Sequence, residues 1–190
     1  MSLKLDNLVE LHDLSQSSFV VDVGGYLGDY SQKVLDKFDC SILIFEPHPV
    51  MYEHLLKRFI KAVNVSIENK ALTRIGVPEL YQNLDGSTLY ESWYKKNQRI
   101  NDEKLQVQGI LASKRLKGLS IDVLKLNCEG SEYDIIEDLH EHGMLKDIDE
   151  LLIQFHKVPE LLPHYRKCID FLSKTHEKVF NHKWQLWKKM

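Results

Sequence analysis

The sequence predicts an α/β fold built on a mostly parallel sheet that ends in an antiparallel hairpin. Short apolar runs alternate along the chain with stretches whose apolar residues recur at helical spacing, which favours parallel strands joined by helices. The apolar runs show little polar alternation, which is typical of strands buried on both faces. Residues 176–188 do alternate, and they predict an antiparallel pair at the end of the sheet.

The predicted elements follow one another in a regular order over most of the chain. Strands are expected at residues 18–23, 41–45, 63–67, 121–126, 148–155, 176–180 and 184–187. Helices are expected at residues 30–38, 49–59, 132–142 and 159–173. Between Asn69 and Gly109 the pattern is less regular, with short strands expected only at residues 71–72, 80–81 and 105–110. We therefore expect a single domain over residues 1–190, with an irregular loop insertion at about 85–103.

Composition narrows the classes of protein that the chain can belong to. The 190 residues include 25 Lys and Arg against 28 Asp and Glu, a net charge of −3, so no overall basic field would attract nucleic acid. No run approaches the ~20 apolar residues of a membrane-spanning helix, and the N-terminus lacks the apolar core of a signal peptide. Three widely spaced cysteines form no CxxC motif. We expect a cytoplasmic protein with no membrane partner.

A glycine-rich turn follows the first predicted strand and precedes the first helix of the regular pattern. Its sequence reads D-x-G-x-x-x-G, with Asp22, Gly24 and Gly28 at the fixed places. Glycines allow a sharp turn and close approach of a ligand, and the helix start offers unpaired N–H groups. The run matches neither GxGxxG nor a P-loop. A tight turn without a ligand remains the alternative.

An acidic residue, Glu46, ends the next predicted strand. Ligands of doubly wound sheets lie outside the carboxyl ends of the strands. A carboxylate at that position can accept hydrogen bonds from both hydroxyls of a ribose and disfavours a 2′-phosphate. A solvated strand-end acid is the alternative, but the acid together with the glycine turn favours a ribose site.

Several motifs in the same order resemble the FkbM family of methyltransferases. They are FVVDVGGYLGDYS, ILIFEPHPVMYEHL, ENKALT, DGSTL, IDVLKLNCEGSEYDII and QFH, spread over residues 18–157. The most specific motif covers residues 124–132. The resemblance implies a Rossmann-like, seven-stranded, mostly parallel sheet with helices on both faces, the class I methyltransferase fold. It also implies an S-adenosylmethionine-dependent enzyme whose acceptor is a hydroxyl of a small molecule or glycan.

The resemblance implies cofactor contacts for residues on the first three strand ends. The methionine part would lie against Asp22, Gly24 and Gly28, the ribose against Glu46 with Pro47 shaping the wall, and the adenine between Ala71 and Leu72. Tyr26 stands where the family has a small or amide residue, so its ring would crowd the methionine pocket or cover it.

The resemblance also implies that Asn127, Glu129 and His156 face the methyl-transfer site. Methyl transfer to a hydroxyl gains from a general base, and His156 and Glu129 are the candidates. A structural histidine and a helix N-terminal charge are the respective alternatives. Asn127 replaces the aspartate typical of the family and cannot act as a base. Lys125 lies within the strand pattern, and we expect its ammonium to reach a strand-end carboxylate.

Two further segments combine aromatic and basic residues. The 87–103 loop is a candidate acceptor lid: three of its aromatic residues could stack on a sugar and three basic ones could meet an anion, namely Tyr90, Trp93, Tyr94, Lys95, Lys96 and Arg99. Aromatics that pack back on the core are the alternative. In the tail, Trp184 and Trp187 favour a sheet edge with one buried face over a nucleic-acid surface.

Three functions compete at this level. An S-adenosylmethionine-dependent O-methyltransferase acting on a small molecule or glycan is favoured. A non-catalytic domain that keeps the fold is the alternative, and a nicotinamide-dependent oxidoreductase is disfavoured by the broken GxGxxG. The sequence has no HExxH motif and no dense acidic cluster, so we expect no metal.

Overall fold

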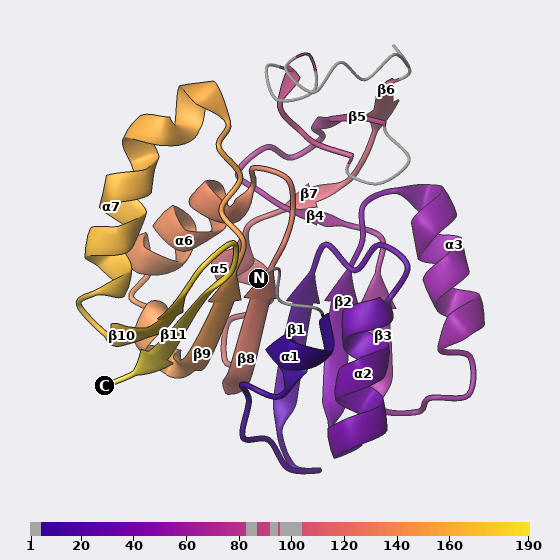
Figure 1. Cartoon of the computed structure of the whole chain (residues 1–190). Coiled ribbons are helices and arrows are strands. Elements are labelled where there is room, and N and C mark those ends of the chain that lie inside the picture. The colour runs from indigo at the N-terminus through magenta and orange to yellow at the C-terminus, as the bar shows by residue number, and fades with distance from the viewer. Residues whose placement is uncertain (1–4, 83–86, 92–94, 96–103) are drawn as a thin grey trace.

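A seven-stranded sheet forms the centre of the computed structural model, which describes residues 5–82, 87–91, 95 and 104–190 (Figure 1). The strand order is β10-β11-β9-β8-β1-β2-β3. Their bounds are β1 Phe19–Val23, β2 Ser41–Phe45, β3 Val65–Glu68, β8 Ile121–Leu126, β9 Ile148–Ile153, β10 His176–Asn181 and β11 Gln185–Lys189. Neighbouring strands from β9 to β3 are parallel, whereas β11 is antiparallel to both β9 and β10. The expected seven-stranded fold is confirmed.

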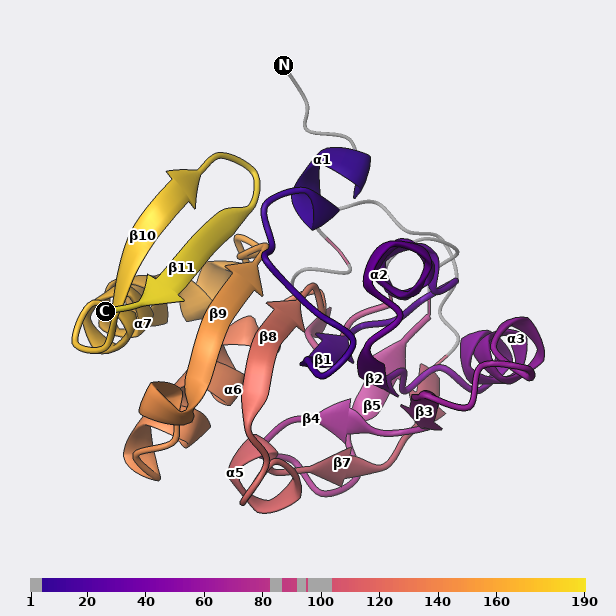
Figure 2. The same ribbon diagram turned by 90° about the horizontal axis from the view of Figure 1, so that it is seen from below.

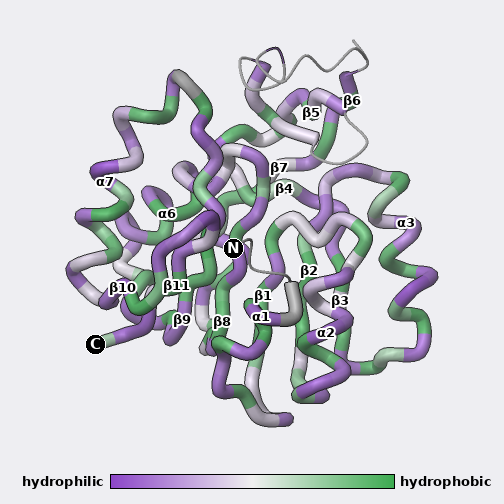
Figure 3. Tube along the Cα trace, viewed as in Figure 1, coloured by the Kyte–Doolittle hydropathy of each residue, from purple (hydrophilic) through white to green (hydrophobic). Residues whose placement is uncertain are grey.

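Helices cover both faces of this sheet (Figure 2). One layer contains α1 Leu5–Val9, α2 Asp29–Phe38 and α3 Pro49–Arg58, and the other contains α5 Ala112–Arg115, α6 Glu132–Glu141 and α7 Leu162–Leu172. Adjacent strand residues point to opposite layers: Val20 packs with the first set and Val21 with the second. Such two-sided burial explains the continuous apolar runs of the central strands (Figure 3).

Two small sheets lie beyond the carboxyl ends of the central strands (Figure 1). Strand β4 Ala71–Leu72 pairs in parallel with β7 Gly109–Ile110, and β5 Glu79–Tyr81 pairs antiparallel with β6 Lys104–Gln106. The strand expected at 105–110 is therefore wrong as one element. The chain leaves one small sheet after Gln106 and joins the other at Gly109, because β5 and β4 lie in different sheets.

The tail forms the expected sheet edge. Trp184 and Trp187 are buried, one in each layer of the core. Lys188 pairs with Glu150 at 2.6 Å and Lys189 with Asp149 at 3.3 Å. These aromatic rings are therefore not available to stack on a base.

The sequence did not predict the short helices α1 and α5, or the 3-10 turn at Leu145–Asp147. The helix expected at residues 159–173 is a 3-10 turn at Pro159–Leu161 followed by α7. In the described part of the chain, no helix combines the length and apolar character needed to span a membrane.

Candidate active site

A cavity opens at the carboxyl ends of β1, β2 and β8. Strand β1 lies between β2 and β8, so the strand order reverses there, and such a switch point is where open α/β sheets bind ligands. The cavity is lined by strand-end, loop and accessory-sheet residues: Val23, Gly24, Tyr26, Phe45, Glu46, Pro47, His48, Met51, Lys70, Ala71, Leu72, Leu80, Ser87, Leu89, Asn127, Cys128, Glu129 and Ser131. The topology thus brings together residues that are more than a hundred positions apart.

The glycine turn is shaped by two different steric needs. At Gly24 the backbone is left-handed, with φ of 82°, and a Cβ would overlap the carbonyl oxygen of Asn127. At Gly28, with φ of 83°, a Cβ would meet Leu55 and Phe59 on and beside α3. Gly24 therefore lets β1 and β8 approach at the cavity, whereas Gly28 lets α2 pack against α3 and does not line the cavity.

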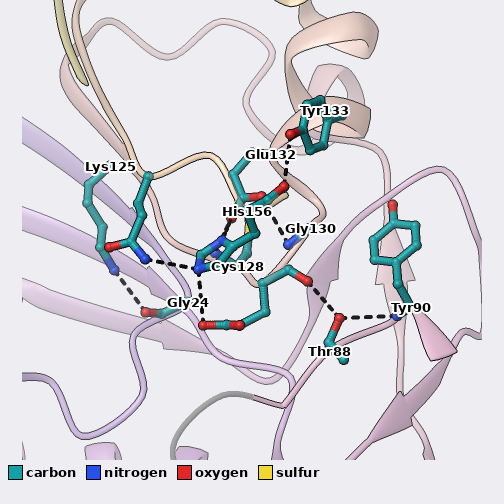
Figure 4. A network of polar contacts seen from close by, with 11 residues as sticks. Gly24, Thr88, Tyr90, Lys125, Cys128, Gly130, Glu132, Tyr133 and His156 are labelled. Atoms are coloured by element: carbon teal, nitrogen blue, oxygen red, sulfur yellow. Dashed lines mark hydrogen bonds and ion pairs between the residues drawn. The ribbon is translucent and has the colours of Figure 1, made fainter. Parts of the chain in front are cut away.

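A buried ion pair supports the turn from below. The carboxylate of Asp22 accepts a hydrogen bond from Ser31 Oγ at 2.6 Å and pairs with Lys125 Nζ at 2.6 Å. Lys125 also donates to the Gly24 carbonyl at 2.9 Å (Figure 4). The structural role expected for Lys125 is confirmed. Asp22 does not line the cavity and acts on it by fixing the backbone of Gly24.

Glu46 holds the two segments that flank it. Its Oε2 accepts from the Tyr26 N–H at 2.7 Å and its Oε1 from the His48 N–H at 2.9 Å. Burial raises the pKa of Glu46, although both backbone N–H groups act in the opposite direction. A carboxylate oxygen has two acceptor sites, so each oxygen keeps capacity for a ligand hydroxyl.

Tyr26 lies in the turn with φ of 50° and lines the cavity while 38% of its surface stays exposed. A residue that both lines a cavity and meets solvent lies at its mouth. Of the two outcomes expected for this ring, covering the pocket fits better than filling it.

The opposite wall is apolar. Ala71 and Leu72, both buried, line the cavity beside Leu80 and Pro47. An apolar wall near a strand-end carboxylate suits the flat face of a purine beside its ribose.

A loop between β8 and α6 supplies the other polar side of the cavity. Glu132 is fully buried below this loop and accepts hydrogen bonds from the N–H groups of Cys128 at 2.8 Å and Gly130 at 3.0 Å. His156 Nδ1 lies 2.9 Å from Glu132 Oε1 (Figure 4). Glu132 therefore fixes the loop that carries Asn127 and Glu129 into the cavity.

The surroundings of His156 favour its structural alternative over the role of general base. Its Nε2 lies 3.2 Å from Glu129 Oε1, so each ring nitrogen faces a carboxylate. Burial alone would lower the pKa of His156, but Glu132 and Glu129 together raise the pKa to about 10. At neutral pH these two carboxylates favour the imidazolium, which has no lone pair for a proton; the Gln154 amide, 3.0 Å from Nε2, would then present its oxygen to that nitrogen. His156 does not line the cavity, and it positions Glu129 instead.

Residues 87–91 pack onto the same loop. Thr88 Oγ1 donates to the Glu129 carbonyl at 2.6 Å, and the Tyr90 ring lies where a Cβ on Gly130 would be (Figure 4). The Tyr90 hydroxyl donates to Asp134 at 3.2 Å. This contact favours the alternative reading of Tyr90, in which the ring packs back on the protein.

The remaining lid residues can be placed only in part. Lys95 pairs with Glu91 at 2.8 Å. Trp93, Tyr94, Lys96 and Arg99 lie outside the described residues.

Sequence reasoning missed three residues that shape the site. Glu132 and Ser131 belong to the 124–132 motif, and Thr88 to the DGSTL motif, so their signal was present. What the sequence did not show is that Glu132 points into the loop and that Ser131 reaches the cavity. The described residues contain no group of three or more His, Cys, Asp or Glu that could hold a metal.

Comparison with known structures identifies the fold. The 23S rRNA methyltransferase ErmE aligns with a TM-score of 0.56 and 10% identity over 98% of this chain and 67% of its own. An O-methyltransferase family protein from Burkholderia thailandensis aligns with a TM-score of 0.54 and 13% identity, over 98% of this chain and 54% of its own. A proposed tRNA (m1A22) methyltransferase from Streptococcus pneumoniae, in complex with S-adenosyl-L-methionine, aligns with a TM-score of 0.54 and 10% identity. The alignment covers 97% of this chain and 70% of the other. The fold is that of class I methyltransferases.

The family follows from the sequence itself. Residues 22–179 match the methyltransferase FkbM domain. The chain belongs to this family and is an S-adenosylmethionine-dependent methyltransferase. No curated protein matches the chain at a significant level.

Proposed function

We propose that the cavity binds S-adenosylmethionine and that the protein methylates a hydroxyl of a small molecule or glycan. The observation that carries the proposal is the convergence of Gly24 and Glu46 on one cavity at the switch point of the sheet. A close-approach glycine and a strand-end carboxylate are the two features that a nucleoside ligand needs there.

The residues present fit the cofactor. Glu46 would accept hydrogen bonds from both ribose hydroxyls, because each of its oxygens accepts one backbone N–H and has capacity for another. Ala71 and Leu72 would lie against the adenine, and Gly24 and Tyr26 would flank the methionine part. Asp22 and Gly28 would act indirectly, through the shape of the turn.

Glu129 is the proton acceptor that the geometry favours. When bound, S-adenosylmethionine supplies an activated methyl group for in-line displacement. The Glu129 side chain lines the cavity and is held by the His156 imidazolium. An orienting cation keeps this carboxylate in one place, and a fixed carboxylate can receive the proton of an acceptor hydroxyl. His156 positions the base, and Asn127 contributes an acceptor oxygen.

Calorimetric titration with S-adenosylhomocysteine tests the cofactor proposal. We expect binding to the wild-type protein, and Glu46→Gln should weaken it by about 1–3 kcal/mol because a charged hydrogen-bond acceptor is lost. Glu141→Gln is the matched control, since Glu141 lies at the far end of α6 and pairs with Arg74. Unfolding midpoints without ligand separate loss of contact from loss of fold. No binding at high micromolar concentration, or equal affinity in the Glu46 variant, would overturn the assignment.

The acceptor is tested separately. A panel of hydroxyl compounds should include monosaccharides, small alcohols and an RNA oligonucleotide with its ribose hydroxyls, because two of the compared folds belong to proteins described as RNA methyltransferases. Turnover with a sugar or small alcohol supports the proposal, and turnover with RNA alone contradicts the acceptor class. Cofactor binding without turnover on any compound would favour the non-catalytic alternative, and tight NADH binding the oxidoreductase.

A further inference from the structure

Two residues that line the cavity each carry a buried polar atom with no hydrogen-bond partner. Among the described residues, Asn127 Oδ1 and Ser131 Oγ are the buried side-chain oxygen or nitrogen atoms in this state. Both residues line the cavity, and Ser131 is only 2% exposed. Leaving a polar group buried and unpaired costs free energy, so each such group in a folded protein requires an explanation.

Other polar groups of the same loop are hydrogen-bonded within the protein. Glu132 accepts from the N–H groups of Cys128 and Gly130, and Thr88 donates to the Glu129 carbonyl. The unpaired atoms of Asn127 and Ser131 lie on either side of this satisfied segment in sequence. A loop that pairs these groups internally, but leaves a polar atom unpaired on each of two cavity-lining residues, is suited to bind a ligand in that cavity.

The chemistry of these atoms defines what they bind. An amide oxygen only accepts hydrogen bonds, and a hydroxyl accepts or donates. The neighbouring Glu129 carboxylate is also an acceptor, and Asp134 adds an acidic residue in the first turn of α6. An anionic ligand is therefore disfavoured here, whereas a group that carries several N–H or O–H donors is favoured.

We propose that Asn127 and Ser131 bind the methyl acceptor beside its reacting atom, and that the acceptor presents hydrogen-bond donors there, as adjacent hydroxyls of a sugar do. One hydroxyl would give its proton to Glu129 while a neighbouring donor meets Asn127 Oδ1. The inference rests on the proposed function and deepens it, because it favours a polyhydroxyl compound over a lone hydroxyl. Asn127 and Ser131 are specificity residues in this scheme, and neither removes a proton.

Sinefungin provides a probe that does not require the acceptor to be known. In this analogue of S-adenosylmethionine, a carbon that bears an amino group replaces the methylated sulfur, so N–H donors occupy the place of the transferred methyl. We expect the wild-type protein to bind sinefungin roughly tenfold or more tightly than S-adenosylhomocysteine in calorimetric titrations. Asn127→Ala and Ser131→Ala should each reduce this ratio severalfold. Asn127→Asp should preserve it, because the acceptor oxygen remains.

Matched controls and outcomes keep the two proposals apart. Ser66→Ala and Asn181→Ala change exposed residues on β3 and β10 and should leave the ratio unchanged. If the wild-type protein binds sinefungin and S-adenosylhomocysteine equally tightly, the inference is overturned. If the preference for sinefungin persists in the Asn127 or the Ser131 variant, that residue does not take part. In both cases, binding of S-adenosylhomocysteine still supports the cofactor site. Failure of S-adenosylhomocysteine to bind overturns both proposals.

The unfolding midpoint of a Ser131 variant is a second measurement, and it distinguishes a ligand-binding role from a structural one. Nothing in the ligand-free protein bonds Ser131 Oγ, so Ser131→Ala should leave the unfolding midpoint equal to that of wild type or raise it. A lower midpoint would show that the hydroxyl supports the fold and would contradict a ligand-binding role.

Discussion

At the residue scale, the site depends on one histidine held as a cation. His156 lies between Glu129 and Glu132, one carboxylate on each ring nitrogen. Glu129 faces the cavity, whereas Glu132 binds the loop from below. The imidazolium therefore connects the loop's internal support to the side chain that would receive the acceptor's proton.

This arrangement makes a pH-dependent prediction for stability. The pKa of His156 is raised from its usual value of ~6.5 to about 10, so the folded protein holds this proton more tightly than the unfolded chain. The stabilisation is complete below about pH 6.5 and is lost as the pH rises through 10. His156→Gln should lower the free energy of unfolding by about 3–5 kcal/mol at pH 6, because two carboxylates lose their cation. The difference from wild type should shrink steadily towards pH 10.

Denaturant unfolding across this pH range is the measurement. His182→Gln serves as the control, since His182 is exposed in the β10–β11 turn. A difference between wild type and His156→Gln that stays constant from pH 6 to 10 would contradict the charged state assigned to His156.

At the element scale, the cavity exists because two loops approach each other at the ends of β1 and β8. Gly24 permits this approach, since any side chain there would overlap the Asn127 carbonyl. The residue pattern showed a glycine turn, but not which backbone it touches, because that neighbour is more than a hundred residues away. Sequence reasoning assigned both Gly24 and Gly28 to the ligand. Gly24 lines the cavity, whereas Gly28 does not, and a Cβ there would meet Leu55 and Phe59.

Substitution of Gly24 separates backbone strain from the close approach. Gly118 has a similar φ, 78° against 82°, but open space around its Cβ position. Gly118→Ala should cost about 1–2 kcal/mol of unfolding free energy from its left-handed backbone alone. Gly24→Ala should cost clearly more and should also weaken S-adenosylhomocysteine binding. Equal losses in the two variants, measured by denaturant unfolding, would show that the contact with Asn127 is unimportant.

The roles of Glu129, Glu132 and Thr88 could not be assigned from the sequence because they depend on how the loops fold. Glu129 and Glu132 are three positions apart, yet one faces the cavity and the other the interior, because Glu129 has a left-handed φ of 51°. The spacing of apolar residues in the sequence does not predict a left-handed turn at a residue that is not glycine. Likewise, the contact of Thr88 with the Glu129 carbonyl joins segments 41 residues apart.

At the scale of the whole molecule, the main sheet could be predicted and the small sheets only in part. The central strands are apolar on both faces, and their successive side chains pack alternately against one helical layer and the other. That composition is visible in the sequence, as is the alternation of the antiparallel tail. Strands β4 to β7 are two or three residues long, which is too short for a pattern to reveal their partners. The single domain over residues 1–190 stays a prediction.

The reversal of strand order between β2, β1 and β8 places Glu46, Gly24 and Asn127 around one cavity. A crystal structure with S-adenosylhomocysteine tests this central claim most directly. We expect the ribose hydroxyls within hydrogen-bond distance of Glu46, the adenine against Ala71 and Leu72, and the sulfur on the side of Asn127. A nucleoside bound elsewhere on the protein, or a cavity that stays empty at saturating ligand, would contradict the account.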